Sequence, residues 1–426
     1  MAPAVALFTR DLRVRDNPVL DASTTAGRTV APLFVFDRTM LERTANGAPH
    51  RFGFLCQSLL DLDNSLRERG ALLIVRRGDW LQEVLQVVYE SRADSVHVAR
   101  DASSYAQRRI ARLERAAARV GVQVIVHDAL TIVAPDGLGK PYESFAWYAK
   151  RWPAGPRREL ARTPRKLQVP SALATEVIPD VSPPGEWVGG ETAALAQLKA
   201  WIPKLRSYEN ERENLAADAT SRLSAALHFG CLSSLDLERR VHDRDGAEPF
   251  LHRLCRRDFF TQLLWWRPEL ARTDLHEGGR GRSRDNPGAL AAWKEGRTGF
   301  PLVDAGMRQL RAEGWMPDPV RAIAASFLTE VLGIDWRAGA AHFMHLLVDG
   351  DIATNQLNWQ WIAGKRAGPG SSRDRLLNPA TQLDRYDLQC EYVRRWIDEF
   401  GTARYPPTMV DHNGVVGQWR AARRHA

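Results

Sequence analysis

The sequence predicts a Rossmann-like α/β domain with a parallel sheet, followed by an all-α domain. Over the first third of the chain, short apolar segments rich in Val, Ile and Leu alternate with segments whose apolar residues have helical spacing. From about residue 191 onwards, nearly every periodic segment has helical spacing. Seven prolines lie between the two parts, within residues 151–190, where they favour an extended linker. We therefore expect an α/β domain at 1–130, a linker at 131–193 and a helical domain at 194–426.

Strands and helices alternate in the first domain. The expected strands are the apolar segments 4–10, 29–37, 71–75, 95–99 and 122–127, and the expected helices are 52–69, 80–91 and 104–120. This alternation predicts a parallel sheet that helices cover on both faces. No G-x-G-x-x-G sequence follows the first strand, which excludes an ordinary dinucleotide site. Any ligand of this domain would therefore bind at the carboxyl ends of the strands.

The second domain should consist of helices. Segments with helical spacing are 194–206, 233–240, 249–266, 290–295, 301–313, 319–332, 337–348 and 391–400. Most of the chain's 14 Trp residues also fall after residue 145. Core packing is the simplest explanation for any single one of them.

Composition limits the class of protein. The 426 residues are 44% hydrophobic and 26% charged, which excludes a disordered or fibrous protein. The sequence has no run of 18 apolar residues and no signal-peptide pattern, so we expect a cytoplasmic protein without membrane spans. Four cysteines without a C-x-x-C pair argue against a zinc site and a disulfide framework. The formal net charge of +8 is compatible with a polyanionic partner such as nucleic acid.

Two polar motifs in the helical half are candidate binding sites. Residues 220–224 (TSRLS) place hydroxyl groups and an Arg at a helix start, which is typical of an anion site or of a plain N-terminal cap. Residues 349–355 (DGDIATN) bring two carboxylates and an amide together but lack the further oxygen ligands of a calcium loop. The alternatives for the second motif are a polar turn, or a buried carboxylate that pairs with a cation such as Arg321.

Tryptophans recur near the second motif, at Trp359, Trp361 and, upstream, Trp336. They are compatible with core packing, with a surface on which nucleic-acid bases stack, or with electron transfer to a redox cofactor. The pattern alone leaves these three interpretations open.

Taken together, these segments resemble the photolyase/cryptochrome family over nearly the whole chain. Residues 8–17 (FTRDLRVRDN) are similar to the family's opening FRxDLRxxDN, and Tyr208 stands twelve residues before the TSRLS motif. The other matching segments are Asn286-Pro, 293–308 (WKEGRTGFPLVDAGMR), Gly314-Trp-Met, Asp335-Trp-Arg, 349–355, Trp359-Gln-Trp and Asn378-Pro. The resemblance implies an antenna-type α/β domain and an all-α C-terminal domain that binds FAD.

The resemblance assigns flavin contacts to both polar motifs. The pyrophosphate and the ribityl chain would be held by Tyr208, Thr220, Ser221, Leu223 and Ser224. The isoalloxazine ring would be contacted by an ion pair of Arg321 with Asp349, by Asp351 at the ring or ribose edge, and by Asn355 at flavin N5.

The resemblance also assigns an electron relay. Trp359 and Trp336 match the inner two members of the family's Trp triad, and the outer position falls at Ser283. Trp265 or Trp266 could replace the missing outer Trp. An amide at Asn355 is the photolyase-like choice and should favour the fully reduced flavin.

In this family, excited reduced FAD passes an electron to a pyrimidine dimer that is flipped out of DNA, the dimer splits, and the electron returns. The resemblance also implies an antenna pigment, either deazaflavin or folate, near residues 99–109, although nothing in that segment selects one. A monomer is the expected oligomeric state.

The resemblance fails at the positions that contact the lesion. Arg253 stands where the family has a lesion-contacting Glu, and Arg256 stands where it has a stacking Trp. Asp318 replaces an Asn and Ala322 replaces a Met, so Trp361 is the one usual contact that we can place. A stacking Trp contributes about 1–3 kcal/mol per base, so its loss matters.

The substituted pocket should prefer an anion, because guanidinium groups such as those of Arg253 and Arg256 bind carboxylate and phosphate. The alternative is that these arginines and Arg257 turn outward or pair with Asp258 and Asp318.

Three functions remain. The family default is light-driven repair of pyrimidine dimers in DNA. The first alternative is a light-dependent flavoenzyme that acts on a small anionic molecule, and the replaced lesion contacts favour it. The second alternative is a cryptochrome-like photoreceptor. We take repair as the leading prediction.

Overall fold

The structure is a computed structural model that describes residues 2–38, 41, 48–170, 173–275, 284–364 and 377–411. Internal contacts divide the chain into two compact units. The sheet unit comprises Met1–Arg206, Ser221–Glu269 and Val348–Ala353, and the helical unit comprises Ser207–Thr220, Leu270–Leu347 and Thr354–Ala426. The domain ranges 1–130, 131–193 and 194–426 stay a prediction, because compact units follow space rather than chain order.

The sheet unit is built on five parallel strands, which confirms the predicted α/β class. The strands are β1 (Ala4–Leu7), β2 (Val30–Asp37), β3 (Ile74–Gly78), β4 (Ser95–Ala99) and β5 (Gln123–His127). They lie in the order β3-β2-β1-β4-β5, and every pairing is parallel. The order reverses direction between β1 and β4, since the chain goes from β1 outwards to β3 and then returns to β4 on the other side. The predicted third strand began at residue 71, but pairing with β2 begins only at Ile74.

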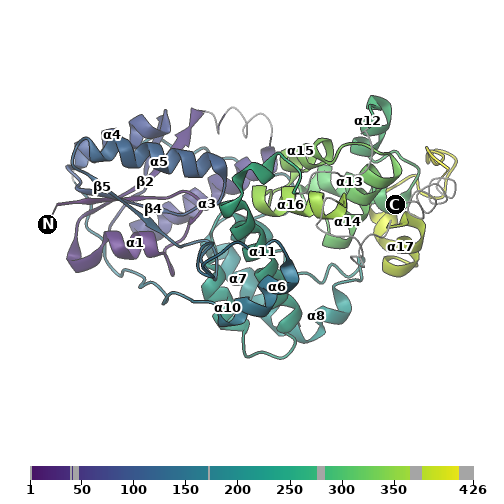
Figure 1. Ribbon diagram of the computed structural model, residues 1–426, viewed down its shortest axis with the longest axis horizontal. Helices are drawn as coiled ribbons and strands as arrows, with labels where there is room; N and C mark the ends of the chain where they lie inside the picture. Colours follow the sequence, from purple (N-terminus) through teal and green to yellow (C-terminus); the bar gives the residue numbers. More distant parts are fainter. Residues whose placement is uncertain are drawn as a thin grey trace. The chain divides into compact units, whose positions relative to one another are not determined.

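Helices cover both faces of this sheet (Figure 1). The helices that connect the strands are α1 (Pro18–Ser23), α3 (Pro49–Arg67), α4 (Trp80–Ser91) and α5 (Ser104–Ala118). Helices α4 and α5 lie on one face and α1 lies on the other. Apolar side chains of α4, among them Val84 and Val87, pack into one buried cluster with Val5, Leu7 and Val96 of the strands.

The Pro-rich segment between Gly155 and Gly190 contains no helix or strand in its described part. Hydrogen bonds fix it along the sheet unit. The Val30 amide donates to the Gln168 carbonyl at 2.8 Å, and the Glu176 amide donates to the Val75 carbonyl at 2.9 Å. The segment is therefore extended, as its prolines predict, and it is held along its length.

The remaining helices of the sheet unit are α6 (Phe145–Arg151), α7 (Glu191–Trp201), α9 (Ser224–His228), α10 (Ser234–Val241) and α11 (Glu248–Trp266). Helix α6, which periodicity did not predict, packs on α11, with the ring centroids of Phe145 and Phe259 5.5 Å apart. Its seven residues are too few for a periodic signal.

The helical unit confirms the predicted all-α part. Its helices are α12 (Pro287–Glu295), α13 (Pro301–Glu313), α14 (Asp318–Ser326) with a π-helical continuation (Phe327–Val331), α15 (Trp336–Leu346), α16 (Ile352–Ile362, which begins in the sheet unit), α17 (Pro379–Tyr386) and α18 (Glu391–Trp396). Helix α8 (Leu205–Glu211) leads from the sheet unit into this one. The core contains Trp293, Met307, Phe327, Trp336 and Trp359. No helix within the described ranges is both long and apolar enough to span a membrane.

Candidate active site

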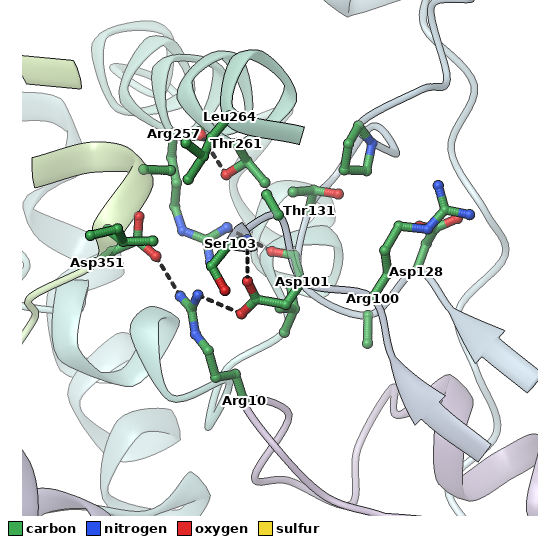
Figure 2. Close-up of a pocket in the computed structure, with 16 residues that line it drawn as sticks. Arg10, Arg100, Asp101, Ser103, Asp128, Thr131, Arg257, Thr261, Leu264 and Asp351 are labelled. Atoms are coloured by element: carbon green, nitrogen blue, oxygen red, sulfur yellow. Dashed lines mark hydrogen bonds and ion pairs between the residues drawn. The ribbon is translucent and has the colours of Figure 1, made fainter. Parts of the chain in front are cut away.

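A crevice lies at the carboxyl edge of the sheet, where the strand order reverses between β1 and β4 (Figure 2). Several of its lining residues come shortly after the end of a strand. Arg10 follows β1, Asp101 follows β4 and Asp128 follows β5. Helix α11 adds Arg257, and the segment before α16 adds Asp351. Open α/β sheets bind their ligands at such a switch point, so the crevice lies where the topology predicts a site. The side chains leave about 20 Å³ of room, enough for one water molecule.

Arg10 joins the two carboxylates of this crevice, as Figure 2 shows. Its Nη1 lies 2.9 Å from Asp101 Oδ2, and its Nη2 lies 2.6 Å from Asp351 Oδ2. Its Nε donates to the carbonyl of His228 at 3.0 Å. Burial opposes ionisation of Asp351, but the charge of Arg10 holds the pKa of that carboxyl well below its usual range. Burial and Arg10 together lower the pKa of His228 to about 4, so the imidazole is neutral at physiological pH.

The N-terminal motif has a structural role beside this crevice. Arg13 is 1% exposed and donates to the carbonyls of Gly230, Ala129 and Asp16 at 2.8–2.9 Å. Gly230 has φ +67°, and a Cβ there would lie 1.9 Å from the Arg10 carbonyl oxygen. Close approach of residues 10–13 to the end of α9 therefore requires glycine at position 230.

Helix α11 carries a second buried polar group. Asp258 Oδ2 accepts three hydrogen bonds of 3.0 Å, from the Ile132 and Val133 amides and from Trp152 Nε1. Arg257 donates instead to the Leu130 carbonyl at 2.6 Å. Asp258 Oδ2 is thus held by main-chain and indole donors, and the alternative that the arginines turn outward or pair with Asp258 and Asp318 stays a prediction.

Arg253 and Arg256, the predicted substrate contacts on α11, are both half-buried. The guanidinium carbon of Arg256 lies 5.1 Å from the ring centroid of Phe145 on α6, within the range of a cation–π contact. The other predicted pocket residues belong to the helical unit: Asp318 and Ala322 on α14, and the half-buried Trp361 on α16. A shared pocket of these residues stays a prediction.

The predicted phosphate contacts provide two buried hydroxyl groups. Within the described residues, Thr220 Oγ1 and Ser224 Oγ are buried and have no hydrogen-bond partner. Burying a hydroxyl group without a partner costs about 1–3 kcal/mol, so native structures seldom leave two of them close together in the sequence. Tyr208 and Leu223 are also buried, and Ser221 is half-buried. Each of the two hydroxyl groups fits a phosphate, which would accept its hydrogen. Thr220 and Ser224 belong to different units, so a shared phosphate site stays a prediction.

We expect Ser224→Ala and Thr220→Val each to weaken FAD binding about tenfold while leaving the free energy of unfolding of the apoprotein unchanged or higher. Removing a hydroxyl group without a partner costs the apoprotein nothing, whereas the flavin complex loses about 1.4 kcal/mol of hydrogen bonding. Flavin fluorescence titration and urea unfolding of the apoprotein measure the two quantities. An equal loss of FAD-binding free energy and of apoprotein unfolding free energy would show that the hydroxyl groups stabilise the fold instead.

Three predicted ring contacts come from both units. Arg321 Nε donates to the Met316 carbonyl at 2.8 Å. Asp349 lies near Arg51, whose pKa burial lowers to about 10 against the opposing effect of Asp349. Arg321 and Asp349 belong to different units, so their ion pair stays a prediction. Asn355 is buried on α16, and its amide nitrogen donates to the Ala340 carbonyl at 3.1 Å, which fixes the orientation of the amide.

The predicted relay tryptophans lie in the core of the helical unit. Trp359 and Trp336 are each 2% exposed. Trp359 packs directly on α15, since a Cβ on Gly339 would lie 2.2 Å from its Cη2 atom. Gly339 stands three residues after Trp336 on α15, so Trp359 packs on this helix within one turn of Trp336. The outer relay position, Ser283, lies outside the described residues.

Gly339→Ala should destabilise the protein by about 1–3 kcal/mol and slow electron transfer to Trp359. The new methyl group would also lie 2.5 Å from Leu328 Cδ2, so it must displace a rigid ring in a closed core. Urea unfolding and the photoreduction rate measure the two effects. The control is Gly288→Ala on α12, where the nearest atom would lie 3.8 Å away and Ala should stabilise by up to about 1 kcal/mol. Equal behaviour of the two variants would contradict this packing argument.

Two family models match this chain. The FAD binding domain of DNA photolyase matches residues 250–415, and the DNA photolyase domain matches residues 4–168. The chain belongs to the photolyase/cryptochrome family and contains that family's FAD-binding domain.

Its relatives carry names from both branches of the family. The deoxyribodipyrimidine photo-lyase of Streptomyces griseus is 43% identical over 96% of this chain and 92% of its own length. The cryptochrome DASH of Natronomonas pharaonis is 34% identical over 96% of this chain and 92% of its own length. The crystal structure of a class III photolyase from Agrobacterium tumefaciens has a TM-score of 0.88 and 29% identity, and covers 100% of this chain and 98% of that one.

Sequence reasoning missed several residues of this region. It singled out neither Arg10 nor its partners Asp101 and His228, although Arg10 is the last residue of the predicted strand 4–10 and Asp101 follows the predicted strand 95–99. Their position at the carboxyl ends of neighbouring strands was the signal that could have found them. No group of three or more His, Cys, Asp or Glu side chains within the described ranges could hold a metal ion.

Proposed function

We propose that this protein is a light-driven DNA photolyase that splits pyrimidine dimers. The observation that carries the proposal is the match to the FAD binding domain of DNA photolyase in a chain similar over its length to a deoxyribodipyrimidine photo-lyase. Two buried hydroxyl groups without partners among the described residues, on Thr220 and Ser224, support the predicted phosphate contacts. Flipped bases are the known substrates of this class of enzyme.

The chain's own residues would bind and orient the cofactor. Thr220 and Ser224 would donate hydrogen bonds to the pyrophosphate, and Asn355 presents an amide whose orientation the Ala340 carbonyl fixes. Bound FAD would supply the light absorption and the electron. Trp359 and Trp336, buried in an apolar core, would supply electrons to an oxidised flavin.

The proposal is tested by repair of UV-irradiated oligo(dT). Chemically reduced protein is illuminated with near-UV or blue light, and recovery of thymine absorbance is followed against a dark control. Light-dependent recovery at catalytic amounts is expected. Absence of recovery from protein that carries reduced FAD would reject dimer repair.

The arginines on α11 support a second candidate, a light-dependent flavoenzyme for a small anionic molecule. Arg253 and Arg256 occupy positions where the family has an acid and a stacking aromatic ring, and guanidinium groups prefer carboxylate and phosphate ligands. If DNA is the substrate, Arg256→Trp should strengthen binding to dimer-containing DNA by about 1–3 kcal/mol, the value of one stacked base. The control is Arg239→Trp at an exposed position of α10. No gain over that control favours the second candidate.

Side chains of the segment predicted to lie near an antenna pigment, residues 99–109, make contacts within the sheet unit. Asp101 is bound by Arg10, Tyr105 donates to Asp37, and the Arg109 guanidinium carbon lies 4.1 Å from the Trp80 ring centroid. The antenna pigment, deazaflavin or folate, stays a prediction, and we derive no step through either.

We place the protein in the cytoplasm as a monomer. The thiols of Cys56, Cys231 and Cys255 are free and buried, which fits a reducing compartment that also contains DNA. Fractionation of the source cells and light scattering on the purified protein test the two statements.

A further inference from the structure

Trp336 donates its indole hydrogen to a carboxylate. The Nε1–H group of this residue, the first of α15, donates to Asp274 Oδ1 at 2.9 Å. Trp336 is 2% exposed, whereas the Asp274 side chain is 22% exposed. The carboxylate therefore connects a buried indole with solvent.

Arg337 acts on both partners of this hydrogen bond. Its Nη2 lies 2.7 Å from Asp274 Oδ1, and its guanidinium carbon lies 4.7 Å from the Trp336 ring centroid. A fixed positive charge over the ring raises the cost of placing a second positive charge on it. The same guanidinium group pairs with the oxygen of Asp274 that accepts the indole hydrogen.

The segment that carries Asp274 is held by the motif that carries Trp359. Gln360 is 2% exposed and makes three hydrogen bonds of 2.7–3.1 Å with main-chain groups of residues 270–275. A side chain of α16 thus holds Asp274 against α15, and Trp359 packs on the same helix at Gly339.

We propose that Asp274 is the proton acceptor of Trp336 when Trp336 gives up an electron. This rests on the proposed function, in which Trp359 would supply an electron to the oxidised flavin under light. Trp336 then passes one electron to oxidised Trp359. Its Nε1–H bond breaks, the proton goes to Asp274 Oδ1, and the bonding pair stays on nitrogen. Trp336 is left as a neutral radical. Return of the electron then also requires return of the proton, which slows charge recombination.

The test is transient absorption of FAD-loaded protein after a light pulse, which distinguishes the Trp cation radical from the neutral radical. Asp274→Asn keeps an oxygen that accepts the indole hydrogen bond but cannot take the proton. In this variant we expect neutral-radical formation to slow at least tenfold and its solvent deuterium isotope effect to change. Asp274→Glu, which keeps a base, should restore proton transfer.

Asp335→Asn is the matched control. Asp335 caps α15 and pairs with Arg337 at 3.0 Å, and Trp336 Nε1 donates to Asp274 instead. Unchanged radical kinetics in Asp274→Asn, or an equal change in Asp335→Asn, would overturn the proposal. Unchanged photoreduction in Trp336→Phe would overturn it too, by removing Trp336 from the relay. Dimer repair by chemically reduced protein needs no relay, so failure of the proposed function shows separately in that assay.

Discussion

An Arg10→Ala variant is expected to lose about 3–5 kcal/mol of unfolding free energy and most of its bound FAD. Arg10 is the cation that joins Asp101 and Asp351, whose side chains are only 11% and 15% exposed. Removing one partner of a buried ion pair leaves an uncompensated charge, and here it leaves two. Asp351 is also the carboxylate that the family resemblance places at the flavin, so its displacement should weaken the cofactor site.

Urea unfolding of the apoprotein and the ratio of flavin to protein after purification measure these two losses. The control is Arg206→Ala, which breaks an ion pair with Asp245 whose side chains are 79% and 75% exposed and which should cost at most about 1 kcal/mol. Since Arg10→Ala could also fail to fold, the double variant Arg10→Gln with Asp351→Asn provides a neutral pair. It should recover stability relative to Arg10→Ala but not FAD content. Full FAD content in Arg10→Ala would show that this ion pair does not position Asp351 for the flavin.

The layered part of the fold could be predicted because its signals are local. The strand 95–99 and the helix 80–91 have the predicted bounds, since each is a short apolar run or an amphipathic helix with clear ends. Helix α16 could not be predicted in this way. Buried positions of α16 such as Ala353, Leu357 and Gln360 do not leave one clear polar face, and a helix without such a face has no periodic signal.

The candidate site shows the same difference between local signals and contacts of distant residues. The hydroxyl groups of the TSRLS motif could be proposed from sequence because the residues that carry them are close together in the chain. The role of Asp274 could not be predicted from sequence. It depends on contact with Trp336, 62 residues later, and on hydrogen bonds between Gln360 and the main chain near Asp274. Resemblance to a family predicts the flavin positions, but it has no pattern for contacts that depend on how helices pack.

Asp258 should make the stability of this protein fall as pH rises from about 4 to 6. Burial raises the pKa of this carboxyl to about 6 from its ordinary value of 3.8, and the hydrogen bonds from Trp152 and two amides only partly oppose the effect. Between these two pH values the folded state holds a proton that the unfolded state has lost. Stability therefore decreases with pH in this window, by about 3 kcal/mol over roughly two pKa units.

Asp258→Asn isolates this contribution, because an amide keeps an oxygen for the three donors and does not ionise. Urea unfolding between pH 4 and 8 should show wild type losing about 3 kcal/mol relative to the variant up to pH 6–7, after which the curves run parallel. Trp152→Phe removes a donor that favours the ionised carboxylate, so its window should extend to higher pH. Parallel curves for wild type and Asp258→Asn over the whole range would mean that the three donors already compensate for burial, and that α11 holds a fully ionised carboxylate.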